Sequence, residues 1–225
     1  WTYTDNTSET GYSVAKMGEN GRGEVRRETF YKLTNSAEAP EVPSEGGRNL
    51  VLDTSADWNN GWTSFNGQTN QACSIRYIYN RGLKVGDKVN VRLVLKYSDI
   101  LAVEGETAQC LFTTEGDVTH WDGGRINSIQ RFNIIGSDEV VLESSTIIDS
   151  NHLKNNYWIW RLRVDYVASG KIQWKEAKAE ISETATPYSQ APEDLGWSTD
   201  TLVPTQEQRY LWKFEYVYYS DGSVE

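Results

Sequence analysis

The chain has 225 residues, which is enough for one or two domains with a buried core. Its 32 acidic residues outnumber its 22 basic ones and leave a formal net charge of -10 at pH 7, so it lacks the basic surface typical of nucleic-acid-binding proteins. No stretch approaches the roughly 18 consecutive apolar residues of a membrane-spanning helix. We therefore expect no nucleic-acid partner and no membrane span.

Short runs of alternating apolar and polar residues recur along the chain, separated by Gly, Asn, Asp and Ser. A period of two is typical of strands, and no long helical periodicity is present. Many strands without helices between them predict an all-β fold, an antiparallel β-sandwich. EVRRETFYKLTNSAEAPEVP (24–43) predicts a strand followed by a loop. In chain order, further strands are predicted at CSIRYIYN (73–80), KVNVRLVLKYSDI (88–100), TAQCLFTT (107–114), NSIQRFNII (127–135), EVVLESSTII (139–148), YWIWRLRVDYVASG (157–170) and KIQWKEAKAEI (171–181). GWSTDTLVPTQEQRYLWKFEYVYYSDGSVE (196–225) predicts a loop and then a long strand that ends in an Asp-Gly turn.

The alternation assigns each strand an inward and an outward face. Residues 89, 91, 93, 95 and 97 are all apolar or aromatic, as are residues 158, 160, 162, 164 and 166. Because neighbouring side chains of a strand point to opposite sides, these sets predict the core, with Trp158 and Trp160 among its members. The same phase sends Arg92, Arg161 and Arg163 outward.

Two stretches rich in Pro, Glu, Ser and Ala, at 35–47 and 182–196, divide the chain into a central block and two outer pieces. Neither outer piece can bury its apolar residues alone, and domains are readily inserted at exposed loop tips. We therefore expect Phe30 and Tyr31 to pack with Tyr210 and Trp212 in one small unit. The predicted domains are 1–23, the end of a preceding repeat with a Gly-rich linker; 24–43 with 194–225, a discontinuous small β repeat; and 44–193, an inserted module.

The opening WTYTDNTSE and the closing EYVYYSDGSVE match in kind, although Asn6 stands where the closing copy has Gly222. With GWSTDTLVP and YLW, the outer pieces resemble short repeats in tail proteins of bacteriophages that infect Gram-positive bacteria. The central block resembles the jelly-roll carbohydrate-binding modules of tail fibres and secreted glycanases. This resemblance is carried by GGRNLVLDTSADWNNGW, which looks like their first strand, by LKVGDKVNVRLVLK, and above all by KIQWKEAKAEISETATPYSQAPED.

The resemblance implies a non-catalytic module of a phage tail or receptor-binding protein that attaches the virion to host cell-wall glycans. Its partners would be bacterial cell-wall polysaccharide and other tail or baseplate proteins, and its location the virion tail. A purely structural spacer of a tail fibre is the alternative, and a cell-wall glycan hydrolase is a third. No pair of carboxylates stands out as the acid and base that glycoside hydrolysis requires, so we expect no enzyme.

Aromatic residues in polar loops form the first candidate carbohydrate site. Sugar rings bury their C–H faces on aromatic side chains, and their hydroxyls pair with planar polar groups. An exposed Trp in a loop is costly unless something covers it. The other interpretation is that these tryptophans cap the ends of the sandwich. The loop candidates are Trp58 and Trp62, beside Asn59 and Asn60, and Trp121, Asp122 and Arg125 in THWDGGRIN.

Outward-facing arginines form the second candidate site. Arg offers a planar fork that suits the hydroxyls, carboxylates or phosphates of an anionic polymer. We expect Arg92, Gln109, Tyr157, Arg161 and Arg163 to share the concave face of one sheet. The alternative is an ordinary solvated face on which the arginines pair with Asp165 and glutamates.

The metal and thiol chemistry of the chain is left open by the sequence. DTSADWN and THWDGG could supply oxygen ligands to a structural calcium ion, but no EF-hand loop is present, and no other cofactor is expected. Cys73 and Cys110 could be bridged or could be two free thiols.

Overall fold

The structure is a computed structural model that describes residues 23–43, 46–116 and 130–225. The described residues form strands and two short 3-10 turns, which confirms the predicted all-β antiparallel class. They contain no helix long and apolar enough to cross a membrane. The elements are β1 (Glu24–Thr34), β2 (Gln71–Tyr79), β3 (Lys88–Ala102), β4 (Gln109–Gly116), β5 (Gln130–Asn133), β6 (Gly136–Ile147), η1 (His152–Lys154), β7 (Tyr157–Asp165), β8 (Val167–Ile181), η2 (Pro192–Leu195) and β9 (Tyr210–Tyr219).

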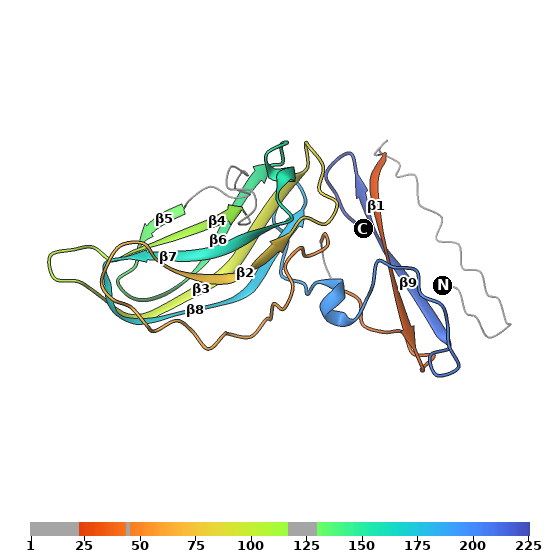
Figure 1. Ribbon diagram of the computed structural model, residues 1–225, viewed down its shortest axis with the longest axis horizontal. Helices are drawn as coiled ribbons and strands as arrows, with labels where there is room; N and C mark the ends of the chain where they lie inside the picture. Colours follow the sequence, from red (N-terminus) through yellow and green to blue (C-terminus); the bar gives the residue numbers. More distant parts are fainter. Residues whose placement is uncertain (1–22, 44–45, 117–129) are drawn as a thin grey trace.

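Seven strands form the sandwich (Figure 1). One sheet has the order β2-β7-β4-β5 and the other the order β6-β3-β8, and every pairing is antiparallel. The chain changes sheet at most of its connections, as it does in a jelly roll. Between the sheets lie the predicted core residues, among them Leu93, Leu95, Trp158 and Trp160, which are fully buried. The phase assigned from the sequence to β3 and β7 is therefore correct.

The strand predicted from residue 157 to 170 is divided in two. Tyr166 has φ 58°, a left-handed conformation that a continuous strand does not contain. The chain reverses there, β7 ends at Asp165, and β8 begins at Val167. Tyr166 therefore turns the chain rather than continuing the inward row of β7.

An irregular segment covers the outer edge of β8 in place of a further strand. Leu50 donates to the carbonyl of Ala179 at 2.7 Å, and Trp62 donates to the carbonyl of Ile172 at 2.7 Å. Within GGRNLVLDTSADWNNGW, which resembles a first strand, only isolated bridges form, at Val51 and Trp62. The positive φ of 56° at Asp53 interrupts the regular ladder, but the segment still pairs the open edge of β8.

The remaining strands, β1 and β9, form a two-stranded antiparallel sheet, called here the ribbon, at one end of the elongated molecule (Figure 1). Phe30 faces Phe214 across the ribbon, and their rings stack with centroids 5.1 Å apart. As expected, Phe30 and Trp212 share one cluster, against which Tyr210 packs. Tyr31, expected in the same set, is outside that cluster and bridges to Ser198. The division of the chain into a repeat and an inserted module remains a proposal.

Alternating charges connect the ribbon to the sandwich. On the ribbon, Arg26 pairs with Asp87 of the β2–β3 connection at 2.9 Å, and Glu28 lies 3.6 Å from Arg48. Arg48 and Arg81 both pair with Glu193 of η2. The Arg48 guanidinium also lies 4.8 Å from the centre of the Phe30 ring, so one buried cation contacts both the acids and the aromatic cluster.

Both cysteines are free thiols. Cys73 lies on β2 and Cys110 on β4, and β7 runs between these two strands. Strands are about 4.8 Å apart, so about 9.6 Å separates alternate strands, which exceeds the roughly 7 Å limit for the Cα atoms of a disulfide. A bridge between Cys73 and Cys110 would therefore require the sheet to rearrange.

Candidate functional site

A hollow of about 300 Å³ lies where the loop after Asp53 crosses the edges of β8 and β2. We call it the Trp58 pocket. Its wall combines two indole rings with carboxamide, guanidinium and carboxylate groups, the types that bind a sugar. The groups used in the argument below are those of Trp58, Asn59, Asn60, Arg76, Trp174 and Glu176.

Hydrogen bonds between the loop and β8 hold this pocket in shape. The backbone amide of Asn59 donates to the carbonyl of Trp174 at 3.1 Å, and the side-chain oxygen of Asn59 accepts from the backbone amide of Trp174 at 2.9 Å. Further along β8, the backbone amide of Glu176 donates to the carbonyl of Ser55 at 2.8 Å. Glu176 has φ 56° and lies at a register shift between β3 and β8, a bulge that locally redirects the strand.

Trp58 is half-buried, and two lysines lie over its ring. The Lys175 ammonium is 4.9 Å and the Lys96 ammonium 5.7 Å from the ring centroid. Cation–π contacts of this kind contribute about 0.5–1 kcal/mol at exposed sites. They hold the indole against the outer surface of the β6-β3-β8 sheet. Trp58 therefore forms part of the pocket wall on the sheet surface, and its role as a sugar platform stays a prediction.

Trp174, which the phase of its strand places in the core, has two roles. It is partly buried and packs against the sandwich core, and it also lines the Trp58 pocket. Sequence reasoning missed this second role because the bulge at Glu176 changes the phase of β8. The interruption of alternation at KEAK is the signal that could have shown it.

Arg92 lies beside this pocket and not on the face predicted for it. It belongs to β3 in the three-stranded sheet, whereas Gln109, Tyr157, Arg161 and Arg163 belong to the four-stranded one. The outer faces of two packed sheets point away from each other, so the prediction of one shared face is wrong for Arg92. It pairs instead with Glu143 at 3.2 Å and with Glu176 of the Trp58 pocket at 3.3 Å.

The other four residues of the predicted arginine face do share one sheet. Tyr157, Arg161 and Arg163 alternate with the core residues of β7, and Gln109 pairs with Asp165 at the far end of that strand. Arg161 forms an ion pair with Glu115 at 3.0 Å. The charge of this face is therefore partly neutralised within the protein, as the solvated-face alternative requires.

The far end of the same face carries a further arginine. Arg131 donates to Gln109 at 2.9 Å and lies 3.3 Å from Asp165. The carboxylate of Asp165 is buried and also accepts from the Asn70 amide at 2.7 Å. Gln109 and Arg131 are thus tied into a structural network.

Three tyrosines at the other end of this face went unpredicted as a group. Tyr77 and Tyr79 of β2 lie against Tyr157, with ring centroids 5.0 and 6.3 Å from it. Tyr77 is 46% exposed. The sequence signal is the pattern RYIYN, but joining it to Tyr157 requires the pairing of β2 with β7, which is a long-range contact.

The other loop candidates differ from Trp58. Trp62 packs against the sandwich core and bridges to Ile172, and its indole donates to the carbonyl of Ser64 at 3.1 Å. It packs along the edge of β8 and not at an end of the sandwich. Trp121, Asp122 and Arg125 lie outside the described residues.

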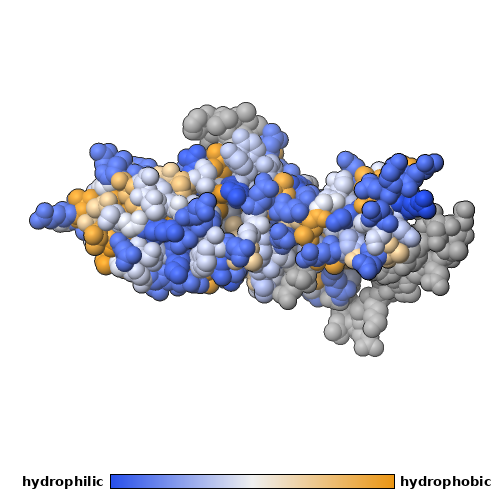
Figure 2. Space-filling view, turned by 90° about the horizontal axis from the view of Figure 1, so that it is seen from below, coloured by the Kyte–Doolittle hydropathy of each residue, from blue (hydrophilic) through white to orange (hydrophobic). Residues whose placement is uncertain are grey.

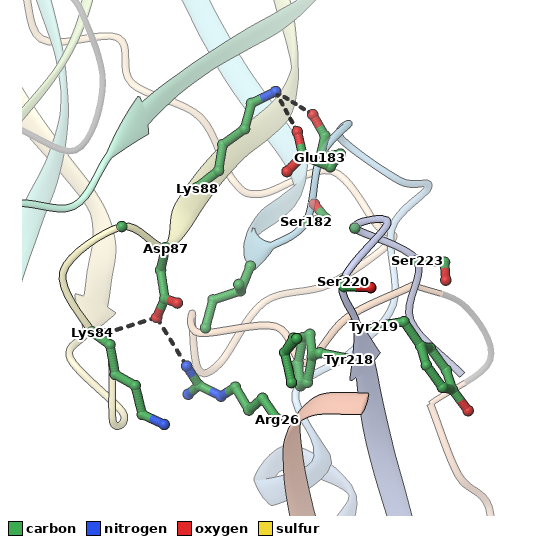
Figure 3. A pocket seen from close by; sticks show the side chains of 14 residues that line it. Arg26, Lys84, Asp87, Lys88, Ser182, Glu183, Tyr218, Tyr219, Ser220 and Ser223 are labelled. Carbon is green, nitrogen blue, oxygen red and sulfur yellow. Dashed lines mark hydrogen bonds and ion pairs between the residues drawn. The ribbon is translucent and has the colours of Figure 1, made fainter. Parts of the chain in front are cut away.

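A second hollow, of about 350 Å³, lies between the ribbon and the sandwich (Figure 3). Most of the charged groups that line it are already engaged. Arg26 pairs with Asp87 at 2.9 Å, and Lys88 pairs with Glu183 at 3.4 Å. Burial raises the pKa of the Tyr218 hydroxyl, and the Arg26 guanidinium lies 5.5 Å from its ring centroid. We therefore regard this hollow as part of the junction.

The calcium hypothesis gains no support from the described residues, which contain no group of three His, Cys, Asp or Glu side chains placed to hold a metal ion. Near the start of DTSADWN, the Asp194 carboxylate accepts the Asp53 amide through both oxygens, at 3.1 and 2.9 Å. Burial raises the pKa of Asp194, and the backbone hydrogen bonds oppose that shift. This carboxylate therefore holds the backbone at the start of the loop that follows Asp53.

The surface outside the hollows is mostly hydrophilic on the face seen in Figure 2, where hydrophobic residues form small, separate groups. The largest exposed apolar side chains among the described residues include Leu101, Ile135 and Val203. Leu101 lies near the end of β3, Ile135 between β5 and β6, and Val203 between η2 and β9. Single exposed apolar residues of this kind are normal in proteins.

Comparison with models of protein families finds no match, and neither does comparison with curated proteins. Among solved structures, the chain is similar to the tripod from the baseplate of bacteriophage Tuc2009, with 13% identity over 84% of this chain and 72% of that one and a TM-score of 0.42. It is also similar to a chain of Broad Bean Stain Virus, with 11% identity over 76% and 96% and a TM-score of 0.28. A third similar structure is the CBM22-1 xylan-binding domain of Xyn10C from Paenibacillus barcinonensis, with 10% identity over 67% and 100% and a TM-score of 0.26. These superpositions are loose, and the fold described above rests on its own strand pairing.

Proposed function

We propose that this protein is a non-catalytic carbohydrate-binding part of a phage tail, and that it binds bacterial cell-wall glycans through the Trp58 pocket. The observation that carries the proposal is the meeting of two indoles, Trp58 and Trp174, with Asn60 and Arg76 in one hollow. A sugar ring can lie on an indole while its hydroxyls pair with the amide and guanidinium groups. The volume of about 300 Å³ is at the lower end of the roughly 300–1,000 Å³ found for ligand pockets.

The tail setting rests on the motifs of the outer pieces, which resemble tail-protein repeats. Under this proposal, residues 44–193 are a module inserted into a small repeat formed by 24–43 and 194–225, and neighbouring tail or baseplate proteins are its other partners. A small pocket gives modest affinity for one site. Several copies on one virion would raise the effective concentration and so the overall avidity.

Binding of purified cell-wall polysaccharide, measured by calorimetry, tests the proposal. Trp58→Ala should weaken binding at least tenfold and change the thermal midpoint little, because Trp58 is outside the core. The matched control is Tyr77→Ala, which removes an exposed aromatic side chain that does not line the pocket and should leave binding unchanged. If Tyr77→Ala weakens binding and Trp58→Ala does not, the Trp58 pocket is not the site.

Salt separates the two candidate sites further. Contacts between exposed charges are screened as salt rises, whereas stacking on Trp58 is nearly insensitive to it. Titrations at low and high salt should therefore agree for the wild type and for Arg161→Ala. A salt-sensitive affinity that Arg161→Ala removes would assign binding to the face of β7.

The alternatives make their own predictions. A structural spacer would bind no glycan on an array of wall polysaccharides. A hydrolase would release soluble sugar from purified wall, and we expect no such release.

A further inference from the structure

The Trp58 pocket begins at a residue whose backbone conformation needs support. Asp53, on the pocket wall, has φ 56°, in the left-handed region that residues other than Gly adopt at a cost. The chain must turn there to cross from the edge of β2 to that of β8. Asp tolerates this conformation better than most residues, and a neighbouring group that binds the backbone stabilises it further here.

Asp194 is that group. Its carboxylate, in η2, accepts the backbone amide of Asp53 through both oxygens at 3.1 and 2.9 Å and accepts the Thr54 amide as well. On the other side, the Arg76 guanidinium, which lines the pocket, donates to the Asp53 carbonyl at 2.8 Å. The Thr54 hydroxyl lies 3.1 Å from that of Tyr188. Both polar backbone groups of Asp53 are thus held from outside the loop.

The turn η2 that carries Asp194 is itself held by the ribbon and the junction. Glu193, the residue before Asp194 in η2, pairs with Arg48 and Arg81. Lys32 of β1 donates to the carbonyl of Leu195 at 2.5 Å. Trp197, which follows η2, is buried in the aromatic cluster of the ribbon. The turn therefore contacts the ribbon on one side and the pocket loop on the other.

We propose that Asp194 is a positioning residue that fixes the loop of the Trp58 pocket, and that η2 links the shape of this pocket to the docked ribbon. The inference concerns the conformation of the loop, and only its consequence for binding rests on the proposed function. It predicts that the pocket depends on residues that do not contact the ligand.

Asp194→Asn tests the proposal, because the amide keeps the shape of the side chain but replaces one acceptor oxygen by a donor. The matched control is Asp200→Asn, which makes the same charge change at an exposed position. The readout is amide hydrogen exchange of Asp53 and Thr54 by NMR. We expect exchange at least tenfold faster in Asp194→Asn and unchanged in Asp200→Asn, with the amides of β3 and β7 protected in both. Unchanged exchange at Asp53 and Thr54 in Asp194→Asn would overturn the proposal.

A second variant covers the case in which Asp194→Asn does not fold. Adding Asp53→Gly removes the cost of the left-handed conformation, because Gly adopts positive φ freely. The double variant should fold, with exchange at Thr54 still faster than in the wild type, and wild-type protection there would contradict the role of Asp194.

Binding of wall polysaccharide is measured in the same samples. Faster loop exchange with at least fivefold weaker binding supports both proposals. Faster exchange in Asp194→Asn, combined with a wild-type protein that binds no polysaccharide, supports the positioning role and counts against the proposed function alone.

Discussion

The sandwich and the ribbon bury their apolar side chains in different ways. The sandwich encloses its core between two sheets, with Trp158, Trp160 and Phe112 fully buried. The ribbon has only two strands, and it gathers Phe30, Trp197 and its other aromatic residues into one cluster. An isolated pair of strands is marginal in water because it cannot enclose a core.

Charged residues between the ribbon and the sandwich contact the aromatic cluster, which the two strands alone cannot enclose. Arg48 lies on the Phe30 ring and between two acids, Glu28 and Glu193. Burial raises the pKa of the Tyr216 hydroxyl, which has no hydrogen-bond partner within the described part of the chain. The ribbon therefore depends on the sandwich for its stability, whereas the sandwich has a core of its own.

The largest effect is expected in the sandwich, from Trp160→Ala. Trp160 has no exposed surface and packs against Phe112 at a centroid distance of 5.2 Å. Removing a buried Trp typically costs about 3–5 kcal/mol. Denaturant unfolding followed by circular dichroism should show this loss for the whole protein, including the ribbon. A ribbon that stays folded while the sandwich melts would break the comparison.

A smaller and more local effect is expected from Arg48→Met. The variant keeps an apolar side chain against Phe30 but leaves Glu28 and Glu193 partly buried without their shared cation. Each acid keeps a second arginine, Arg26 for Glu28 and Arg81 for Glu193, so the expected cost lies below the roughly 3 kcal/mol of a buried charge left without any partner. Hydrogen exchange should become faster at Phe30 and Phe214 while β3 and β7 stay protected. Equal acceleration in both parts would show that they unfold as one unit.

The exposed ion pairs of the ribbon should matter least to its stability. Arg27 lies on β1 like Arg26, but its pairs with Glu24 at 2.6 Å and Glu215 at 2.5 Å are more exposed. Arg27→Met should cost below about 1 kcal/mol, since solvent weakens such pairs. The cost should vanish at about 1 M salt, where the screening length is about 3 Å. A cost equal to that of Arg48→Met would contradict the role given to burial.

The two thiols report on the sandwich alone, and the native protein should barely react. Burial raises the pKa of Cys73 to about 12, and burial also raises the pKa of Cys110. At pH 8 roughly one Cys73 thiol in ten thousand is then a thiolate, the reactive form. Labelling with a disulfide reagent should be slow in the wild type, equally slow in Arg48→Met, and faster in Trp160→Ala. Faster labelling in Arg48→Met would show that the sandwich depends on the ribbon.

The class of the fold and much of its core could be predicted from the amino-acid sequence. The alternation in β3 and β7 is local, so it placed Leu93, Trp158 and Trp160 inward and Arg161 outward without any knowledge of partners. The sequence also indicated that β1 and β9 belong together, because neither outer piece of the chain can bury its apolar residues alone.

Which strands share a sheet, and which loops meet, became visible in the folded structure alone. Arg92 has the phase predicted for it, but its strand pairs with β6 and β8, so it lies beside the Trp58 pocket and away from Arg161. The meeting of Trp58 with Trp174, and of Tyr77 with Tyr157, depends on contacts between residues far apart in the chain. Alternation repeats every two residues in any strand and does not identify the strand that lies next to it in the sheet. The residues of the site, which come from different strands and loops, therefore could not be grouped from the sequence.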